Sequence, residues 1–399
     1  MASESWLREV RNRAKAALSK PSPYGRDVDV TRYVEYVAGK EPKLIEERAR
    51  EVGVDFSAKA IYTQVDQAYF RYLSRIPGIE VKSIEDFIEE NPDIARDYVW
   101  KLLDPALDKY TAVAALKGRG GFFIRVKENT RVDDPVMTCM FMSVGGLQAP
   151  HNVIVLEKGS QVTVYTGCTI APESFGLHVG LSEFYVGEKA ELRYVMVHAW
   201  NNVTHVRPRT VVHVAEEGKY ISYYVNMSRV RTLQTYPKVI QESNTYALQA
   251  SVLLGLGDSE QDVGGMSVLR GHESRSEIVS RIVARDESRV VSRARITTGV
   301  NVAARGHIEC RGMLLSDRAV VETIPELEAL SPNAVLTHEA SIGKLAEDEI
   351  NYLVTRGFKR DEAVGILIRG FVSIDVKNIP ERVKKHIETL ERIVAEKAL

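Results

Sequence analysis

One short stretch near the C-terminal end places a histidine beside an acid. In LTHEASIGKL, residues 336–345, His338 is followed by Glu339 just where an apolar, helix-like pattern begins. Imidazole and carboxylate groups both act as metal ligands. The same pair can also be the polar entrance to a helix, and taken singly His338 is more typical of a helix entrance and Glu339 of a solvated acid. The residues alone leave both interpretations open.

The chain has three cysteines, Cys139, Cys168 and Cys310, far apart in the sequence. This odd number argues against a disulfide framework and for a reducing compartment, so we expect a cytoplasmic protein. There is no CxxC motif, and three thiols cannot supply four cysteine ligands to a cluster. Any iron–sulfur site would therefore need ligands other than cysteine, or a second chain. Free cysteine is often a buried, apolar residue, which is the simplest reading of Cys310 alone.

Composition excludes several classes of protein. Lys and Arg number 53 and Asp and Glu 54, for a net charge of -1, so a nucleic-acid partner is not expected. The first 20 residues predict an amphipathic helix and lack the apolar core of a signal peptide. No run approaches the roughly 20 apolar residues that span a bilayer. We therefore expect a soluble protein without a membrane partner.

The middle of the chain is a succession of strand patterns. Runs such as NVIVL, QVTVYTG and YISYYV replace helical spacing after residue 117. Charged turns recur between them at 157–160, 187–190 and 216–219, about 30 residues apart, a spacing typical of one coil in a stacked solenoid. The pattern favours a parallel β-helix. A β-sandwich stays open, because strand periodicity does not reveal the connections.

Three regions follow from these patterns. We expect a mainly helical N-terminal region over residues 1–110, a β-helix core over 111–336 and a C-terminal helical domain over 337–399. The flanking helices could cap the two ends of the stack.

The C-terminal region should contain three helices. Helical spacing covers residues 344–356 and 360–369, and each pattern is stopped by a glycine. Pro380 opens a third helix whose apolar stripe must pack on something.

Three separated stretches resemble one known family. They are TGCTIAPESFGLHVGLSEFYVGEKAELRYVMVHAW, GHIECRGMLL, and IPELEAL followed by THEASIGKLAEDEINYLVTRGFKRDEAVGILIRGFV. In this order they resemble the SufB/SufD family, the scaffold subunits of SUF iron–sulfur cluster assembly, over about residues 105–375. The resemblance implies a right-handed parallel β-helix between helical ends, dimerisation through the β-helix, and docking of the ATPase subunit SufC on the C-terminal helices.

The resemblance also implies roles for four residues. Cys310 matches the SufB cysteine that holds the nascent cluster at the dimer interface, and His338 and Glu339 match the SufB His-Glu pair, where SufD has His-Gly. Cys168 matches the cysteine that accepts persulfide sulfur. A mixed set of thiolate, imidazole and carboxylate holds iron more loosely than four thiolates, which suits a scaffold that must release its product. Two paired chains would bring two copies of each ligand.

The chain departs from the SufB pattern along the sulfur route. Trp200 matches a SufB tryptophan, but His198 stands where SufB has glutamine. Cys139, Met140 and Met142 occupy a strand where SufB has an Arg-Ile-Asn stretch, and we expect them to pack in that strand rather than bind metal. These departures leave the route of the sulfur open.

Partners and cofactors follow from the same resemblance. The Gly-Lys pair at 343–344 lacks the first glycine and the Ser/Thr of a P-loop, so a SufC-type ATPase must supply ATP hydrolysis. A cysteine desulfurase would supply sulfur, and the cluster would be bound only transiently. Type of cluster, iron donor and need for a reduced flavin stay open. A homodimer is favoured over a dimer with a SufD-like paralogue.

Two other functions compete with the scaffold, which is itself no enzyme. One is a SufD-like accessory subunit without its own cluster. The other is a carbohydrate-active β-helix enzyme, which would act through clustered carboxylates on an exposed coil face. Cluster reconstitution separates the first from the scaffold, and binding of acidic polysaccharide would support the second.

Overall fold

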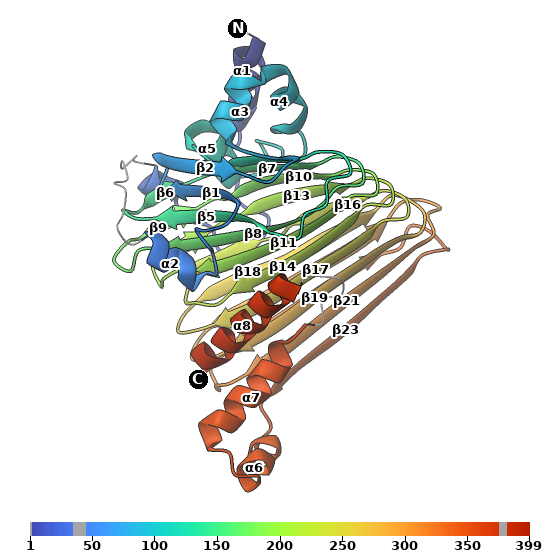
Figure 1. Cartoon of the computed structure of the whole chain (residues 1–399). Helices are drawn as coiled ribbons and strands as arrows, with labels where there is room; N and C mark the ends of the chain where they lie inside the picture. Colours follow the sequence, from blue (N-terminus) through green and yellow to red (C-terminus); the bar gives the residue numbers. More distant parts are fainter. Residues whose placement is uncertain (1, 35–44, 375–380) are drawn as a thin grey trace.

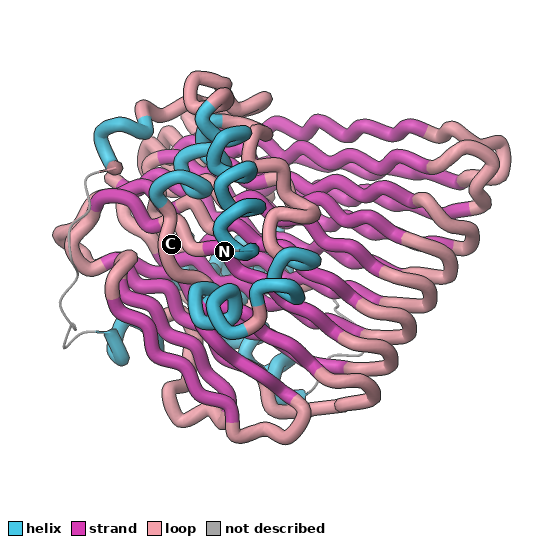
Figure 2. Tube along the Cα trace, turned by 90° about the horizontal axis from the view of Figure 1, so that it is seen from above, coloured by secondary structure: helices cyan, strands magenta, loops and turns pink. Residues whose placement is uncertain are grey.

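The chain forms a parallel β-helix of about eight turns with helices at both ends (Figure 1). The computed structural model describes residues 2–34, 45–374 and 381–399. The predicted fold class is confirmed, and the recurring charged turns lie between successive strands, once in each coil. Seen from above, the turns stack along the edge of the strands, and the N-terminal helices lie over the first coils (Figure 2).

Two sheets face each other across the interior. Sheet A contains, in spatial order, β2 (Tyr69–Ser74), β1 (Ala60–Val65), β5 (Val136–Met142), β8 (Gln161–Ile170), β11 (Glu191–Ala199), β14 (Lys219–Asn226), β17 (Tyr246–Gly255), β19 (Ser274–Ala284), β21 (Ala304–Leu314) and β23 (Val335–Lys344). Sheet B contains β3 (Ile79–Ser83), β4 (Phe122–Val126), β7 (His151–Leu156), β10 (Leu181–Val186), β13 (Arg209–Val214), β16 (Lys238–Gln241), β18 (Glu260–Leu269), β15 (Thr232–Thr235), β12 (Thr204–Val206), β9 (Gly176–His178) and β6 (Gly146–Gln148), with β20 (Arg289–Thr298) paired to β18 and β22 (Val320–Glu328) paired to β20.

Each coil stacks the same positions above those of the coil before. Pairing from β5 to β23 is parallel, so inward-facing residues form rows that run along the solenoid. One inward row of sheet A consists of Thr138, Thr166, Met196, Tyr224, Ser251, Ser280, Cys310 and Ala340. The next inward row consists of Met140, Cys168, His198, Asn226, Leu253, Ile282, Gly312 and Ile342. These two rows contain Cys168 and Cys310, whereas His338 lies in the inward row of Ile308 and Glu339 faces outward.

The N-terminal region caps the first coil with helices and strands together. Its helical elements are α1 (Ala2–Lys15), η1 (Val30–Tyr33), α2 (Ile45–Glu51), α3 (Ile84–Glu90), α4 (Pro92–Tyr98) and α5 (Lys109–Lys117). The expectation of mainly helices missed β1, β2 and β3, which pair with the solenoid or with each other. Asp108 caps α5 through the backbone N–H groups of Tyr110 and Thr111 and binds the Arg209 guanidinium at 2.7 Å, so the cap is tied to sheet B.

The C-terminal region consists of α6 (Glu347–Thr355), α7 (Arg360–Val372) and α8 (Glu381–Ala398). Gly357, with φ of 99°, follows α6, as predicted, whereas Gly370 lies inside α7 and does not end it. The apolar stripe of α8 packs on the outer face of sheet A, where Leu390 and Val394 are buried. Helices α6 and α7 project beyond the last coil (Figure 1).

Candidate functional site

Cys310 lies inside the last part of the solenoid, on β21. Its side chain is 4% exposed, and its Sγ donates to Ser292 Oγ of β20 in the opposite sheet at 2.9 Å. Burial raises the pKa of the Cys310 thiol, while hydrogen bonding with Ser292 and Ser280 opposes that shift. The thiol is therefore protonated at neutral pH in the resting chain, and metal binding would have to displace its proton.

His338 and Glu339 lie on β23, a strand and not a helix entrance. The prediction that LTHEASIGKL opens a helix is wrong. The whole stretch from Val335 to Lys344 pairs with β21, and α6 begins only at Glu347, where three consecutive acids occupy the first turn. Pairing with the neighbouring strand of the solenoid thus determines the structure of this stretch, despite its helix-like sequence pattern.

Because side chains alternate along a strand, His338 and Glu339 point to opposite faces. His338 is in register with Ile308 and shares the inward face with Cys310. Glu339 is in register with Glu309 on the outer face, where the Arg311 guanidinium lies 3.4 Å from its carboxylate. One chain therefore brings together two of the three predicted ligands.

Cys310 and His338 are diagonal neighbours. From the spacing of strands and residues, their Cα atoms are about 8 Å apart, and the residue directly beside Cys310 on β23 is Ala340. Within the described residues, no group of three or more His, Cys, Asp or Glu side chains is arranged to hold a metal ion. The predicted ligand set is incomplete within one chain.

The last coil has two open edges. In the described chain, β23 pairs only with β21 and β22 pairs only with β20. Both strands expose apolar side chains, with Val320 40%, Val335 58% and Ile342 43% exposed. Unpaired strand edges are able to pair with a second chain.

Cys168 lies on β8, inside an earlier coil, between Met140 of β5 and His198 of β11. It is 2% exposed. Burial raises the pKa of the Cys168 thiol well above its ordinary value, and nearby Cys139 raises it further. The resting chain thus offers neither the lowered thiol pKa nor the access that sulfur transfer requires.

Cys139, Met140 and Met142 are all buried strand residues, in accord with the expectation that they pack. Met140 and Met142 belong to the interior cluster, whereas Cys139 packs with the outer-face cluster of Val52 and Val54. Burial raises the pKa of the Cys139 thiol to about 12, so it is a poor ligand.

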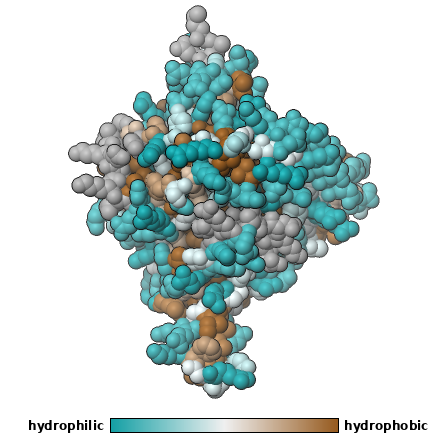
Figure 3. Space-filling view, viewed as in Figure 1, coloured by the Kyte–Doolittle hydropathy of each residue, from teal (hydrophilic) through white to brown (hydrophobic). Residues whose placement is uncertain are grey.

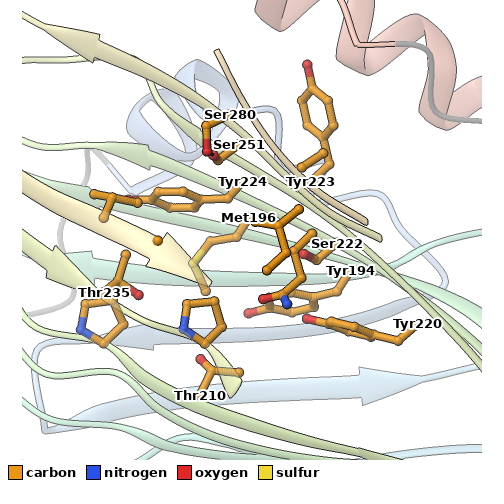
Figure 4. Close-up of a pocket in the computed structure, with 17 residues that line it drawn as sticks. Tyr194, Met196, Thr210, Tyr220, Ser222, Tyr223, Tyr224, Thr235, Ser251 and Ser280 are labelled. Carbon is orange, nitrogen blue, oxygen red and sulfur yellow. Dashed lines mark hydrogen bonds between the residues drawn. The ribbon is translucent and has the colours of Figure 1, made fainter. Parts of the chain in front are cut away.

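A narrow, partly polar cavity lies in the solenoid between the strand of Cys168 and the strand of Cys310 (Figure 4). The volume of the cavity that is accessible to water is about 60 Å³. Its lining includes Tyr194, Met196, Tyr220, Ser222, Tyr224, Gln249, Ser251 and Ser280. Sequence analysis did not identify this lining, although the alternation of Tyr220, Ser222 and Tyr224 in YISYYV could have signalled inward-facing polar groups.

Hydrogen bonds extend from this cavity toward both cysteines. The Tyr224 hydroxyl lies 2.8 Å from Nδ1 of His198, the neighbour of Cys168. At the other end, Ser251 bonds Ser280 at 3.0 Å, and Ser292 lies 3.3 Å from Ser280 and 2.9 Å from the Cys310 sulfur. The two cysteines are five strand spacings apart in sheet A, about 24 Å, and polar groups line part of that distance.

Comparisons with known proteins agree with this architecture. Residues 140–371 match the model of the SufBD core domain, described as SUF system FeS cluster assembly. An iron-sulfur cluster assembly SufBD family protein of Archaeoglobus fulgidus is 38% identical over 353 residues, which cover 87% of this chain and 95% of the relative. A homologue from Methanothermobacter thermautotrophicus strain Winter is 35% identical, over 94% and 95% of the two chains. In the described residues, no helix is both long and apolar enough to cross a membrane.

Proposed function

Because this chain belongs to the SufBD family of iron–sulfur cluster assembly proteins, we propose that it is a SufB-like scaffold subunit. In this proposal the chain is no enzyme: iron and sulfide are its cargo, assembled on it and handed on. The observation that carries the proposal is the position of Cys310, an inward thiol one strand from the open edge that bears His338. A cytoplasmic location stays a prediction.

The proposed cluster site is shared between two copies of the chain. Cys310 and His338 face the same side at the open end of the solenoid, and a second copy paired there would bring another Cys310 and His338. Glu339 faces outward and would join only if β23 twists when it pairs. Three ligands of different hardness hold iron less firmly than a thiolate cage, which favours release of the cluster.

A homodimer is supported by the two open edges of the last coil. Pairing through β22 and β23 would satisfy their free backbone groups and cover the exposed Val335 and Ile342 side chains. A paralogous SufD-like partner could use the same edges, so a dimer purified from the chain expressed alone supports self-pairing.

Docking of a SufC-type ATPase is proposed on α6 and α7. Exposed apolar residues lie on α6 (Tyr352, 58%), on α7 (Ile366, 37%) and between the two helices (Phe358, 42%). Figure 3 shows hydrophobic atoms, in brown, on this projecting end of the molecule. Such side chains on a protruding element are typical of a protein interface.

Deletion of residues 360–399 would also remove α8 and uncover sheet A, so a surface substitution is the sharper test.

That test is Phe358→Asp, assayed by co-purification with the ATPase. We expect the complex to be lost while the melting temperature of the chain changes little, because Phe358 is exposed. Val300→Asp is the matched control, since Val300 is 72% exposed on a distant turn. Retention of the ATPase by Phe358→Asp would count against this docking face.

Cys168 is proposed as the acceptor of sulfane sulfur from a desulfurase. Two observations support the proposal: the Cys168 side chain faces the interior, and a polar cavity lies between the strand of Cys168 and the strand of Cys310. Because Cys168 is buried, sulfur delivery by a protein would require the coil to open.

The SufD-like accessory subunit is the second candidate, favoured by one observation: Glu339 does not face Cys310. Anaerobic reconstitution with ferrous iron and sulfide, with and without reduced flavin, separates the two. A scaffold gains the absorption band of a cluster, and Cys310→Ala loses it; an accessory subunit gains none. Family membership leaves no observation in favour of a carbohydrate-active enzyme.

A further inference from the structure

A second cavity lies between sheet B and the N-terminal segment 20–29, which precedes η1. Its wall includes Gly25 and Arg26 of that segment, Arg207 before β13 and Gln234 of β15. The volume accessible to water is about 220 Å³, enough for a small ligand. None of the residues proposed to hold the cluster or to accept sulfur lines this cavity, so an inference drawn from it goes beyond the proposed scaffold function.

Arg207 is a fully buried guanidinium, and the acceptors of its hydrogen bonds are all neutral oxygens. Its Nη1 donates to the carbonyls of Val206 and Thr232 at 2.9 and 3.1 Å. Its Nη2 donates to the Arg26 carbonyl at 2.8 Å and to the Thr232 hydroxyl at 2.7 Å. Within the described residues, its Nε has no partner. Burial lowers the pKa of Arg207, but arginine stays protonated in proteins, so the cavity wall contains a buried positive charge.

The carboxylates around this charge are already paired with other cations. Three of them line the cavity, and each pairs with a different arginine of its wall: Glu260 with Arg26 at 2.9 Å, Glu322 with Arg289 at 2.5 Å and Asp262 with Arg293 at 2.9 Å. The nearby Asp27 pairs with Lys109 at 3.2 Å. Among the described residues, Arg207 is thus the arginine of this wall without a carboxylate partner. A buried charge without a partner is costly, so an anion in the cavity would stabilise the folded chain.

Gln234 adds a second buried N–H donor to the same wall. Its Oε1 accepts from the Ser22 hydroxyl at 2.7 Å and from Arg209 at 2.8 Å, which fixes the orientation of the amide. The residue is 1% exposed, and in the described chain its Nε2 has no partner. A Cβ at Gly25 would lie only 2.9 Å from Nε2, so this glycine, with φ of 68°, leaves the space beside the nitrogen open. Folded proteins rarely leave such buried groups unpaired.

We propose that this cavity binds a small oxyanion between the Arg207 guanidinium and the Gln234 amide. Phosphate, sulfate and carboxylate groups share the required chemistry, because each accepts N–H hydrogen bonds and supplies the missing negative charge. Hydrogen bonds from a guanidinium to an anion are stronger than those between neutral groups. A metal cation would leave both N–H donors unpaired. The bound anion would also tie segment 20–29 to sheet B, since Gly25 and Arg26 belong to that segment.

The test titrates the full-length chain with inorganic phosphate while sodium chloride keeps the ionic strength constant. Binding is followed by the linewidth of the phosphorus-31 resonance and by thermal melting. We expect saturable binding, competition by sulfate, and a rise in melting temperature of about 2 °C at ten times the dissociation constant. A parallel melting series with sodium acetate measures whether the site also accepts a carboxylate.

Gln234→Glu is the sharpest variant. It keeps the oxygen that Ser22 and Arg209 contact, so it should fold, and it replaces the unpaired donor with a carboxylate oxygen. This internal negative charge should weaken phosphate binding at least about tenfold. Arg207→Met, which removes the positive charge, should have the same effect.

The matched control is Arg229→Gln, which removes a positive charge from a half-exposed arginine outside the cavity and should bind phosphate as the native chain does. If Arg207→Met fails to fold, Gln234→Glu decides the result. Native protein that shows no saturable binding of phosphate, sulfate or acetate would overturn the inference. Equal binding by native protein and Gln234→Glu would also overturn it, because stabilisation of both chains alike is the general effect of such anions on folded proteins.

Discussion

The middle of the solenoid and its last coil have the same kind of strand but different surroundings. Leu253 and Ile342 belong to one inward row, yet Leu253 is fully buried and Ile342 is 43% exposed. Leu253 has a neighbouring coil on both sides, whereas Ile342 has one on a single side. Burial in a repeat protein thus depends on the next repeat, not on residue type alone. The last coil is the part that a second chain could complete.

The two inward cysteines differ in the same way. Cys168 is enclosed by coils before and after it, and its thiol pKa is raised well above the ordinary value. Cys310 has only β23 beyond it, and serine hydroxyls oppose the upward shift of its pKa. Both thiols are buried, but Cys168 lies inside closed coils, whereas Cys310 lies one strand from the open edge.

The largest expected effect comes from truncating matched positions in the two regions. Leu253→Ala should lower the free energy of unfolding by about 2–5 kcal/mol, because it leaves a cavity in a closed coil. Ile342→Ala should lower it by less than about 1 kcal/mol in the monomer, because the side chain is already partly in water. Chemical denaturation of both variants measures this difference, and equal losses would contradict the contrast between closed and open coils.

Alkylation of the thiols sharpens the comparison. A raised pKa means less thiolate at a given pH, so both cysteines should react with iodoacetamide more slowly than free cysteine at pH 8, and faster as the pH rises. Cys310 should gain reactivity at a lower pH than Cys168, since its shift is smaller and it is near the open end. Peptide mapping between pH 7 and 10 gives both rates. A Cys168 that reacts first would contradict this order.

The smallest expected effect on stability concerns Glu339. Its contact with Arg311 is exposed, with side chains 57% and 43% accessible, so Glu339→Gln should change the free energy of unfolding by less than about 0.5 kcal/mol. Iron bound after reconstitution should nevertheless fall if β23 twists to present this carboxylate. Unchanged iron content would remove Glu339 from the ligand set and leave Cys310 and His338.

The sequence predicted the architecture better than the site. Strand runs, charged turns at a constant interval and the apolar stripe of α8 each report local structure, and these predictions are confirmed. The hairpin of β1 and β2 was missed, because β1 joins the solenoid by pairing with a strand distant in the sequence, β5.

The site depended on register, which one sequence does not reveal. His338 and Glu339 are adjacent in the chain, yet strand alternation sends them to opposite faces. His338 and Cys310 are 28 positions apart in the chain, and stacking makes them neighbours. The helical misreading of β23 arose because an exposed edge strand lacks the alternation of apolar and polar residues that marks a half-buried strand.

The most direct test asks whether the cluster requires two chains. Native protein and Ile342→Lys, which places a charge on the inward face of the edge strand, would be reconstituted anaerobically and separated by size with light scattering, and iron and sulfide measured in each fraction. We predict iron and sulfide only in native dimer fractions, and an iron-free monomer for Ile342→Lys. Iron and sulfide bound stoichiometrically to a monomer with Cys310 intact would contradict a site shared between chains.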